Sequence, residues 1–143
     1  MNRIKINLPN QFNFSIQMDI RVTDLNYGGH VGNDAILSLL QEARQQFLQS
    51  KGYAELEVES YGLIMADAMI EYKKELNHRD KIKIAVTAAD FDKLGFDLYY
   101  QVLIINNGEE VLAVRAKTGM MLYDYDAKKK VSLTDEIISK LSF

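Results

Sequence analysis

The sequence contains no cysteine, a single proline (Pro9) and two histidines in 143 residues. Without cysteine the chain can form neither a disulfide, nor a thiolate zinc site, nor a cysteine nucleophile. The same absence suits a reducing compartment, so we expect a cytoplasmic location. With so little proline, the helices and strands should be long and rarely interrupted.

The sequence also lacks a basic surplus and a long apolar segment. Its net charge of −3 argues against a nucleic-acid partner, which would require a basic face. The apolar runs fall well short of the ~20 residues that cross a bilayer, and residues 1–13 lack the apolar core of a signal peptide. We therefore expect no membrane association. Hydrophobic residues make up 48% of the chain, and this length and composition predict one globular domain spanning residues 1–143.

One long helix is predicted near the start of the chain. Asn33 has the chemistry of an N-cap, and Asp34 in the first turn suits the helix dipole. Leu37 and Leu48 widen the apolar stripe, so the helix should be deeply buried, and Gly52 marks its end. The stripe itself follows helical spacing and consists of Ile36, Leu39, Leu40, Ala43 and Phe47.

Alternating apolar and polar residues predict five strands, one before the helix and four after it. Their ranges are 15–22, 63–76, 81–91, 95–105 and 110–125. The connections between the last four strands are short and rich in turn residues, which predicts that successive strands pair as antiparallel hairpins. Ser132 and Asp135 resemble a capping box and predict a C-terminal helix.

A single helix cannot cover both faces of such a sheet. The sheet should therefore curl around the helix in an α+β arrangement, and its edges and outer face need a partner. Apolar strand residues such as Leu112, Val114 and Met120 would lack cover in a single chain. We therefore expect a homodimer or a homotetramer, and no stable monomer.

The segment from Arg21 to Arg44, RVTDLNYGGHVGNDAILSLLQEAR, carries the candidate chemistry. It resembles the signature of the hotdog-fold acyl-CoA thioesterases, in the branch similar to 4-hydroxybenzoyl-CoA thioesterase. That signature is Asp-x-Asp-x-x-Gly-His-Val-x-Asn followed by a long helix with Glu-Ala-Arg. The matching residues are Asp24, Asn26, Gly29, His30, Val31, Asn33 and Glu42-Ala43-Arg44.

The resemblance implies a hotdog fold, in which a long central helix is wrapped by a five-stranded or six-stranded antiparallel sheet. It also implies sites at the interface between subunits, hydrolysis of an acyl-CoA or acyl-carrier-protein thioester, and no cofactor. Since the chain has no cysteine and few histidines, we further expect no metal site and an activity independent of divalent metal.

One position departs from the signature. Asn26 stands where the family has its catalytic carboxylate, and an amide can neither attack a thioester nor act as a base. This motivates an alternative function, a non-catalytic hotdog module that binds acyl thioesters or acyl chains. If the protein is an enzyme, its base must lie elsewhere, with Asp24 and Glu42 as equal candidates ahead of Asp34 and Asp67.

The candidate catalytic residues are thus Asn26, His30, Asp24 and Glu42, and the candidate substrate-binding residues are Tyr27, Gly28, Gly29, Asn33 and Asp67. Backbone N–H groups at Gly29 and the start of the helix are candidate donors to an oxyanion. Structural alternatives stay open for several of these residues. His30 can satisfy a loop carbonyl, Asn26 can form a turn, and Glu42 can be a surface charge on the helix.

Overall fold

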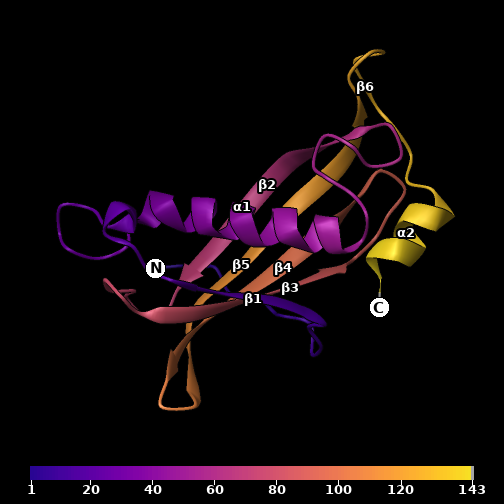
Figure 1. Cartoon of the computed structure of the whole chain (residues 1–143). Coiled ribbons are helices and arrows are strands. Elements are labelled where there is room, and N and C mark those ends of the chain that lie inside the picture. The colour runs from indigo at the N-terminus through magenta and orange to yellow at the C-terminus, as the bar shows by residue number, and fades with distance from the viewer. Residues whose placement is uncertain (143) are drawn as a thin grey trace.

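The computed structural model describes residues 1–142, which form two α-helices and six strands. The elements are β1 (Phe14–Asp19), a 3-10 helix (Val22–Asp24), α1 (Asn33–Ser50), β2 (Gly62–Tyr72), β3 (Lys81–Ala89), β4 (Gly95–Asn106), β5 (Glu109–Asp124), β6 (Lys129–Lys130) and α2 (Asp135–Leu141). The long helix α1 lies across one face of the sheet, and α2 lies beyond one end of it (Figure 1). The expected α+β class is confirmed, with β6 as a short sixth strand.

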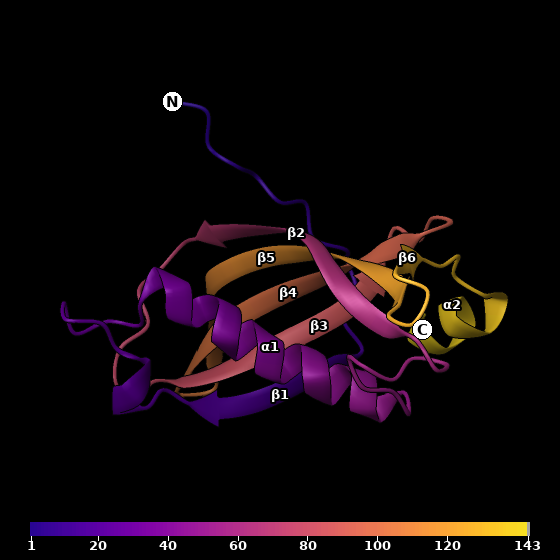
Figure 2. The ribbon, with the colours of Figure 1, turned by 90° about the horizontal axis from the view of Figure 1, so that it is seen from above.

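All strand pairs are antiparallel, in the order β1-β3-β4-β5-β2, with β6 attached to β5. The hairpins β3–β4 and β4–β5 are confirmed. The predicted hairpin between β2 and β3 is wrong, because β3 lies between β1 and β4 whereas β2 pairs with β5 at the edge of the sheet. A short polar connection indicates that the chain reverses its direction, but it does not show which strand the next strand will pair with. Residues 73–80 instead cross the end of the sheet, beside the start of α1 (Figure 2).

Helix α1 is buried on one side only. The predicted stripe from Ile36 to Phe47 lies in the core, and the Phe14 ring of β1 packs edge-on against Phe47 with ring centroids 5.7 Å apart. The prediction of deep burial is wrong for the opposite side, where Leu37 is 39% exposed. The sequence predicted that Val114 and Met120 would lack cover in a single chain, but both are buried within it. These two residues therefore give no reason to expect a partner.

The helix ends differ slightly from the predicted caps. Gly32 is the N-cap of α1, and Asn33 is its first residue. In α2 the cap is Thr134 rather than Ser132, since the Thr134 hydroxyl accepts a hydrogen bond from the N–H of Ile137 at 3.2 Å. The predicted end of α1 is confirmed, because the C-cap Lys51 is followed by Gly52, which adopts a φ of +82°.

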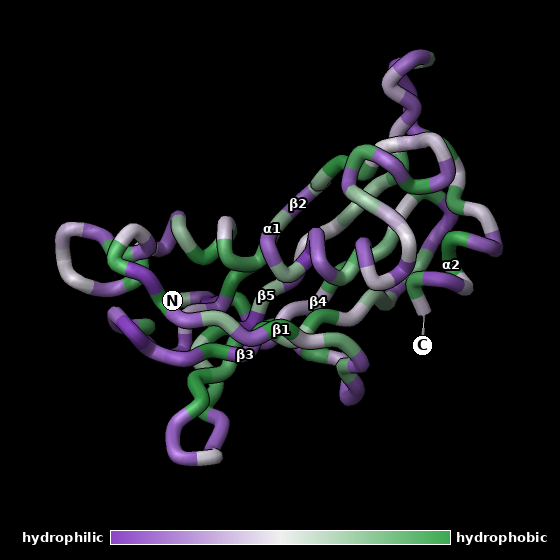
Figure 3. Tube along the Cα trace, in the orientation of Figure 1, coloured by the Kyte–Doolittle hydropathy of each residue, from purple (hydrophilic) through white to green (hydrophobic). Residues whose placement is uncertain are grey.

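Hydrophilic residues gather at the outlying loops, while the strands beneath α1 are largely hydrophobic (Figure 3). Within residues 1–142, no helix has the length and apolar character needed to cross a membrane. The end of the sheet near the start of α1, where the crossover of residues 73–80 meets the loop before α1, combines several polar side chains with a pocket.

Candidate active site at the start of α1

Asn26 organises the loop that precedes α1. Its Oδ1 accepts a hydrogen bond from the N–H of Gly28 at 2.9 Å, and its carbonyl oxygen accepts one from the N–H of Gly29 at 3.1 Å. Its own N–H donates to the carbonyl oxygen of His30 at 2.8 Å. Gly29 has a φ of +83°, a conformation that glycine adopts without strain. Asn26 therefore forms the turn that holds His30.

The tip of this turn faces solvent. Tyr27 is fully exposed, and the N–H groups of Gly28 and Gly29 are already engaged by Asn26. Within residues 1–142, these three residues do not line the pocket beside His30. In the single chain, the glycine N–H groups are thus not free to stabilise an oxyanion.

The crossover of residues 73–80 brings Glu75 to His30. The Nε2 atom of His30 lies 3.2 Å from Oε2 of Glu75, and the two side chains are 41% and 69% exposed. The backbone of His30 forms a β-bridge with Asn77, and the N–H of Val31 donates to the carbonyl oxygen of Leu76 at 2.9 Å. These backbone contacts fix the loop against the crossover and place the imidazole beside the carboxylate.

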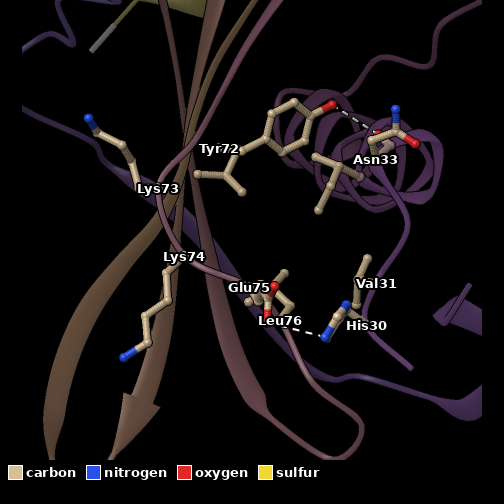
Figure 4. A pocket seen from close by; sticks show the side chains of 10 residues that line it. His30, Val31, Asn33, Tyr72, Lys73, Lys74, Glu75 and Leu76 are labelled. Carbon is tan, nitrogen blue, oxygen red and sulfur yellow. Dashed lines mark hydrogen bonds and ion pairs between the residues drawn. The ribbon is translucent and has the colours of Figure 1, made fainter. Parts of the chain in front are cut away.

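A pocket of about 320 Å³, here called the His30 pocket, opens at this place (Figure 4). It is lined by His30, Val31, Asn33, Ile36, Tyr72, Lys73, Lys74, Glu75, Leu76 and Val114. The hydroxyl of Tyr72 donates to the carbonyl oxygen of Asn33 at 3.1 Å. Burial, assisted by the charge of Asp34, raises the pKa of Tyr72, so this hydroxyl remains a donor at neutral pH.

The pocket includes the N-terminus of α1. Backbone N–H groups in the first turn of a helix have no intrahelical acceptor, and they carry the positive end of the helix dipole. Asn33, the first residue of α1, lines the pocket, and its side-chain Oδ1 accepts a hydrogen bond from the N–H of Asp34 at 3.0 Å. A developing negative charge in the pocket would be stabilised at this end of the helix.

Asp24 and Glu42 line a different pocket, of about 450 Å³, together with Arg21. Asp24 is 8% exposed, and its carboxylate accepts hydrogen bonds from the backbone N–H of Arg21 at 2.8 Å and from its guanidinium at 3.1 Å. Burial alone would raise the pKa of Asp24, but the bonds from Arg21 outweigh it and lower the pKa. Glu42 is exposed and accepts a hydrogen bond from Gln46 at 2.9 Å. The structure therefore does not bring Asp24 or Glu42 to the His30 pocket.

Asp67 lies in β2 on the sheet face opposite α1. Its carboxylate accepts hydrogen bonds from Lys117 Nζ at 2.8 Å and from the N–H of Gly119 at 3.0 Å, and these contacts, the Lys117 bond foremost, lower its pKa. Tyr72, which lines the His30 pocket, is five residues further along β2, about 17 Å away at strand spacing. Asp67 is thus separated from the His30 pocket by distance and by the sheet itself.

Arg44, in the Glu-Ala-Arg part of the signature, belongs to a buried network in the C-terminal half of α1. Its Nε donates to Oε1 of Glu55 at 2.5 Å, and another guanidinium nitrogen donates to the Tyr100 hydroxyl at 3.2 Å. That hydroxyl lies 2.7 Å from Oγ1 of Thr118. Burial would lower the pKa of Arg44, but Tyr100 and Glu55 raise it. Arg44 is therefore a structural cation that ties α1 to the sheet.

Sequence reasoning missed Tyr72, Glu75 and the two lysines between them as pocket residues. They stand about 40 residues from the loop in sequence, and the predicted β2–β3 hairpin would have kept them away from it. A signal was nevertheless present, since three successive charged residues, Lys73, Lys74 and Glu75, interrupt the alternation of the predicted strand 63–76. Among residues 1–142, no three acidic or histidine side chains lie close enough together to hold a metal ion.

Solved structures with the same arrangement include several thioesterases. A 1,4-dihydroxy-2-naphthoyl-CoA thioesterase from Synechocystis is 18% identical, with a TM-score of 0.78 over 90% of this chain and 94% of that one. An aspartate-to-asparagine variant of 4-hydroxybenzoyl-CoA thioesterase, complexed with 4-hydroxybenzoyl-CoA, is 15% identical, with a TM-score of 0.81 over 90% and 98%. A DHNA-CoA thioesterase from Staphylococcus aureus is 17% identical, with a TM-score of 0.77 over 88% of both chains. These likenesses confirm the hotdog fold.

No curated protein matches the sequence at a significant level. The model of the thioesterase-like superfamily, by contrast, matches residues 20–141, which include the loop before α1, α1 itself and every strand except β1. Because this match covers most of the chain, the protein belongs to the thioesterase-like superfamily.

Proposed function

We propose that this protein hydrolyses the thioester bond of an acyl-CoA or acyl-carrier-protein substrate in the His30 pocket. The observation that carries the proposal is the His30–Glu75 pair, 3.2 Å apart at a pocket that also contains the start of α1. Superfamily membership supports thioester chemistry in general, and this geometry supports its location. The absence of cysteine fits the cytoplasm, the compartment that we propose.

In this proposal His30 acts as the general base. If the Nε2–H of His30 donates to Glu75, the other ring nitrogen, Nδ1, is left as an acceptor that can take a proton from water. Glu75 holds the imidazole in that tautomer and stabilises the cation that forms. Asp24 is a poorer base, because its carboxylate is already bound by Arg21 and its pKa is lowered.

The start of α1 stabilises the oxyanion. Attack of water on the thioester carbonyl places a negative charge on its oxygen. The first-turn N–H groups other than those of Asp34 and Ile36, which already have acceptors, can bind that charge. Asn33 lies at this point of the pocket. The proton held by His30 then passes to the departing thiolate, which leaves as the free thiol of the carrier.

Asn26 takes a supporting role. Asn26 does not line the His30 pocket, and its Oδ1 is used in the turn with Gly28, so it acts by holding the loop that carries His30. The substitution of asparagine for the family's carboxylate is then compatible with catalysis, because the base is supplied by the His30–Glu75 pair.

The proposal is tested with a panel of acyl-CoA thioesters and detection of the free thiol. We expect release of the thiol from at least one member of the panel at a rate well above that of the protein-free solution. Binding of acyl-CoA without thiol release would instead establish the alternative function, a non-catalytic acyl-binding module. Asn26 is the specific observation that favours this alternative.

We also propose that the protein is a homodimer that pairs through β2. Within residues 1–142, no strand pairs with the outer edge of this 11-residue strand. The strand contains neither proline nor lysine, the residues that commonly protect an edge, and it exposes Met65 and Tyr72. Antiparallel pairing of two copies would satisfy this edge and place the partner next to the His30 pocket, since Tyr72 belongs to both.

Light scattering tests the assembly. We expect twice the chain mass at micromolar concentration, with the homotetramer as the larger alternative, and a folded monomer would contradict the proposal. A proline in β2 at a residue whose N–H points to the open edge, away from β5, would block edge pairing. Such a variant should therefore shift the protein towards monomer.

A further inference from the structure

A second pocket lies on the other side of the end of β2, between this strand and the N-terminal arm (residues 1–6). It has a volume of about 540 Å³ and is here called the arm pocket. The arm is anchored by Ile6, which is buried and whose N–H donates to Oε1 of Glu71 at 2.8 Å. Beyond this anchor, the arm extends away from β2 (Figure 2). The residues that line the arm pocket include Arg3, Lys5, Glu71, Tyr72, Lys73 and Arg115.

The arm pocket is strongly cationic, although the chain as a whole carries a net charge of −3. Four cations, Arg3, Lys5, Lys73 and Arg115, face a single carboxylate, Glu71. Glu71 is already shared, since it lies 3.3 Å from Lys73 and 3.6 Å from Arg115. The bond from Ile6, followed by these two cations, lowers the pKa of Glu71, which therefore stays ionised.

Arg3 and Lys5 take no part in the ion pairs found within residues 1–142. The arm pocket thus contains two cations without an ion-pair partner among these residues, and it is open to solvent. Arginine binds phosphate oxygens with a planar pair of donors, and lysine adds a point charge, so a phosphate group is the ligand that this combination fits best.

The arm pocket also adjoins the His30 pocket. Tyr72 and Lys73 line both, and the side chains of Lys73 and Lys74 point away from α1 while the Tyr72 ring points towards it (Figure 4). A ligand could therefore extend across the end of β2, with its reacting end beside His30 and an anionic end among the arm cations.

We propose that the arm pocket binds phosphate groups of the thioester's carrier. The identity of the ligand rests on the proposed thioesterase function, whereas the anion site rests on the cations alone. Arg3 and Lys5 lie before residue 20, where the superfamily match begins, whereas Lys73 and Arg115 lie within the matched region. The phosphate can belong to the nucleotide of coenzyme A or to the phosphopantetheine of a carrier protein.

Calorimetric titration with adenosine 3′,5′-bisphosphate and, separately, with 4′-phosphopantetheine tests the proposal at low salt. We expect the variant Arg3→Ala/Lys5→Ala to bind at least one probe about tenfold more weakly than the wild type. The matched control is Lys128→Ala/Lys129→Ala, which removes two exposed cations, one from the turn before β6 and one from β6 itself. This control should leave the dissociation constant within about twofold of the wild type, since distant exposed charges are screened. The probe that responds identifies the source of the phosphate.

A third variant has the opposite expected effect. Glu71→Gln removes the only carboxylate of the arm pocket but keeps an oxygen that can accept the N–H of Ile6, so binding of the same probe should tighten about threefold. The proposal is overturned if neither probe binds the wild type, if both double variants weaken binding equally, or if Glu71→Gln weakens it. Binding that follows the prediction in a protein without thiol release would overturn the proposed function and leave the phosphate site standing.

Discussion

The two ends of α1 hold polar side chains in contrasting surroundings. In the C-terminal half, Arg44 is buried and bonded to Glu55 and Tyr100. At the N-terminus, His30 and Glu75 are paired but largely open to solvent, beside a pocket. Buried polar groups whose bonds are all made stabilise a fold. Groups that keep unused donors and acceptors at a pocket can act on a ligand. Within the thioesterase signature, Arg44 therefore has a structural role, and His30 is placed for a chemical one.

Replacing Arg44 should produce the largest effect on stability. Arg44→Met leaves the Tyr100 hydroxyl and the Glu55 carboxylate without their cation, and breaking a buried pair in this way costs about 3 kcal/mol. Urea unfolding followed by circular dichroism measures the loss. The control is Lys81→Ala, which breaks the exposed pair with Asp19 and should cost less than ~1 kcal/mol. Equal losses in the two variants would show that the Arg44 network is not a special anchor.

Asn26→Asp tests the chemical end of α1. An aspartate can still accept the N–H of Gly28, so the turn and the unfolding temperature should be preserved. The new carboxylate adds a titrating group beside His30 and removes an amide donor. We expect turnover to differ from the wild type by at least ~10-fold at some pH between about 5 and 9, with a displaced acidic limb. Identical pH–rate profiles would mean that position 26 takes no part in the reaction.

Glu75→Gln should have a smaller effect. The amide can still accept a hydrogen bond from His30 but no longer stabilises a charged imidazole. Because the pair is exposed in the single chain, we expect turnover to fall about two- to fivefold. Glu57→Gln, at an exposed loop carboxylate outside the pocket, is the matched control. A rate equal to that of this control would remove Glu75 from the mechanism.

Asp24→Asn should affect the rate least. Asp24 is held by Arg21 away from the His30 pocket, so turnover should change less than about threefold, whereas loss of a general base costs ~100-fold. Its pKa is lowered in the folded chain, so its ionised form stabilises the fold at neutral pH, and this contribution is lost as the pH falls below about 4. Unfolding curves of the variant and the wild type should therefore differ slightly at pH 7 and converge in acid. A 100-fold loss of rate would restore Asp24 as the base.

The elements of this fold were predictable because their signals are local. The apolar stripe of α1 and the alternation in the strands follow from residue spacing alone. The ends were less well predicted, because β1 ends at Asp19 rather than at residue 22 and β2 ends at Tyr72 rather than at residue 76. The pairing of β2 with β5 was not predictable in the same way. It depends on contacts between residues about 50 positions apart, which a short turn between β2 and β3 does not reveal.

The same limit applied to the candidate site. Asn26, His30 and Asn33 were found because they share one loop and the first turn of α1. Glu75 was missed because it reaches His30 through the crossover of residues 73–80. Asp24 looked available as a base because nothing in the residue order shows that the 3-10 helix turns its carboxylate towards Arg21.

The central claim is that thioester hydrolysis depends on His30 in the pocket at the start of α1. The most direct test is the release of free thiol from the best acyl-CoA of the panel by the wild type and by His30→Ala, with circular dichroism to verify the fold. We predict an intact fold and a turnover at least ~10-fold lower in the variant, a cautious floor for the loss of a general base. A folded variant that releases thiol at the wild-type rate would contradict the claim.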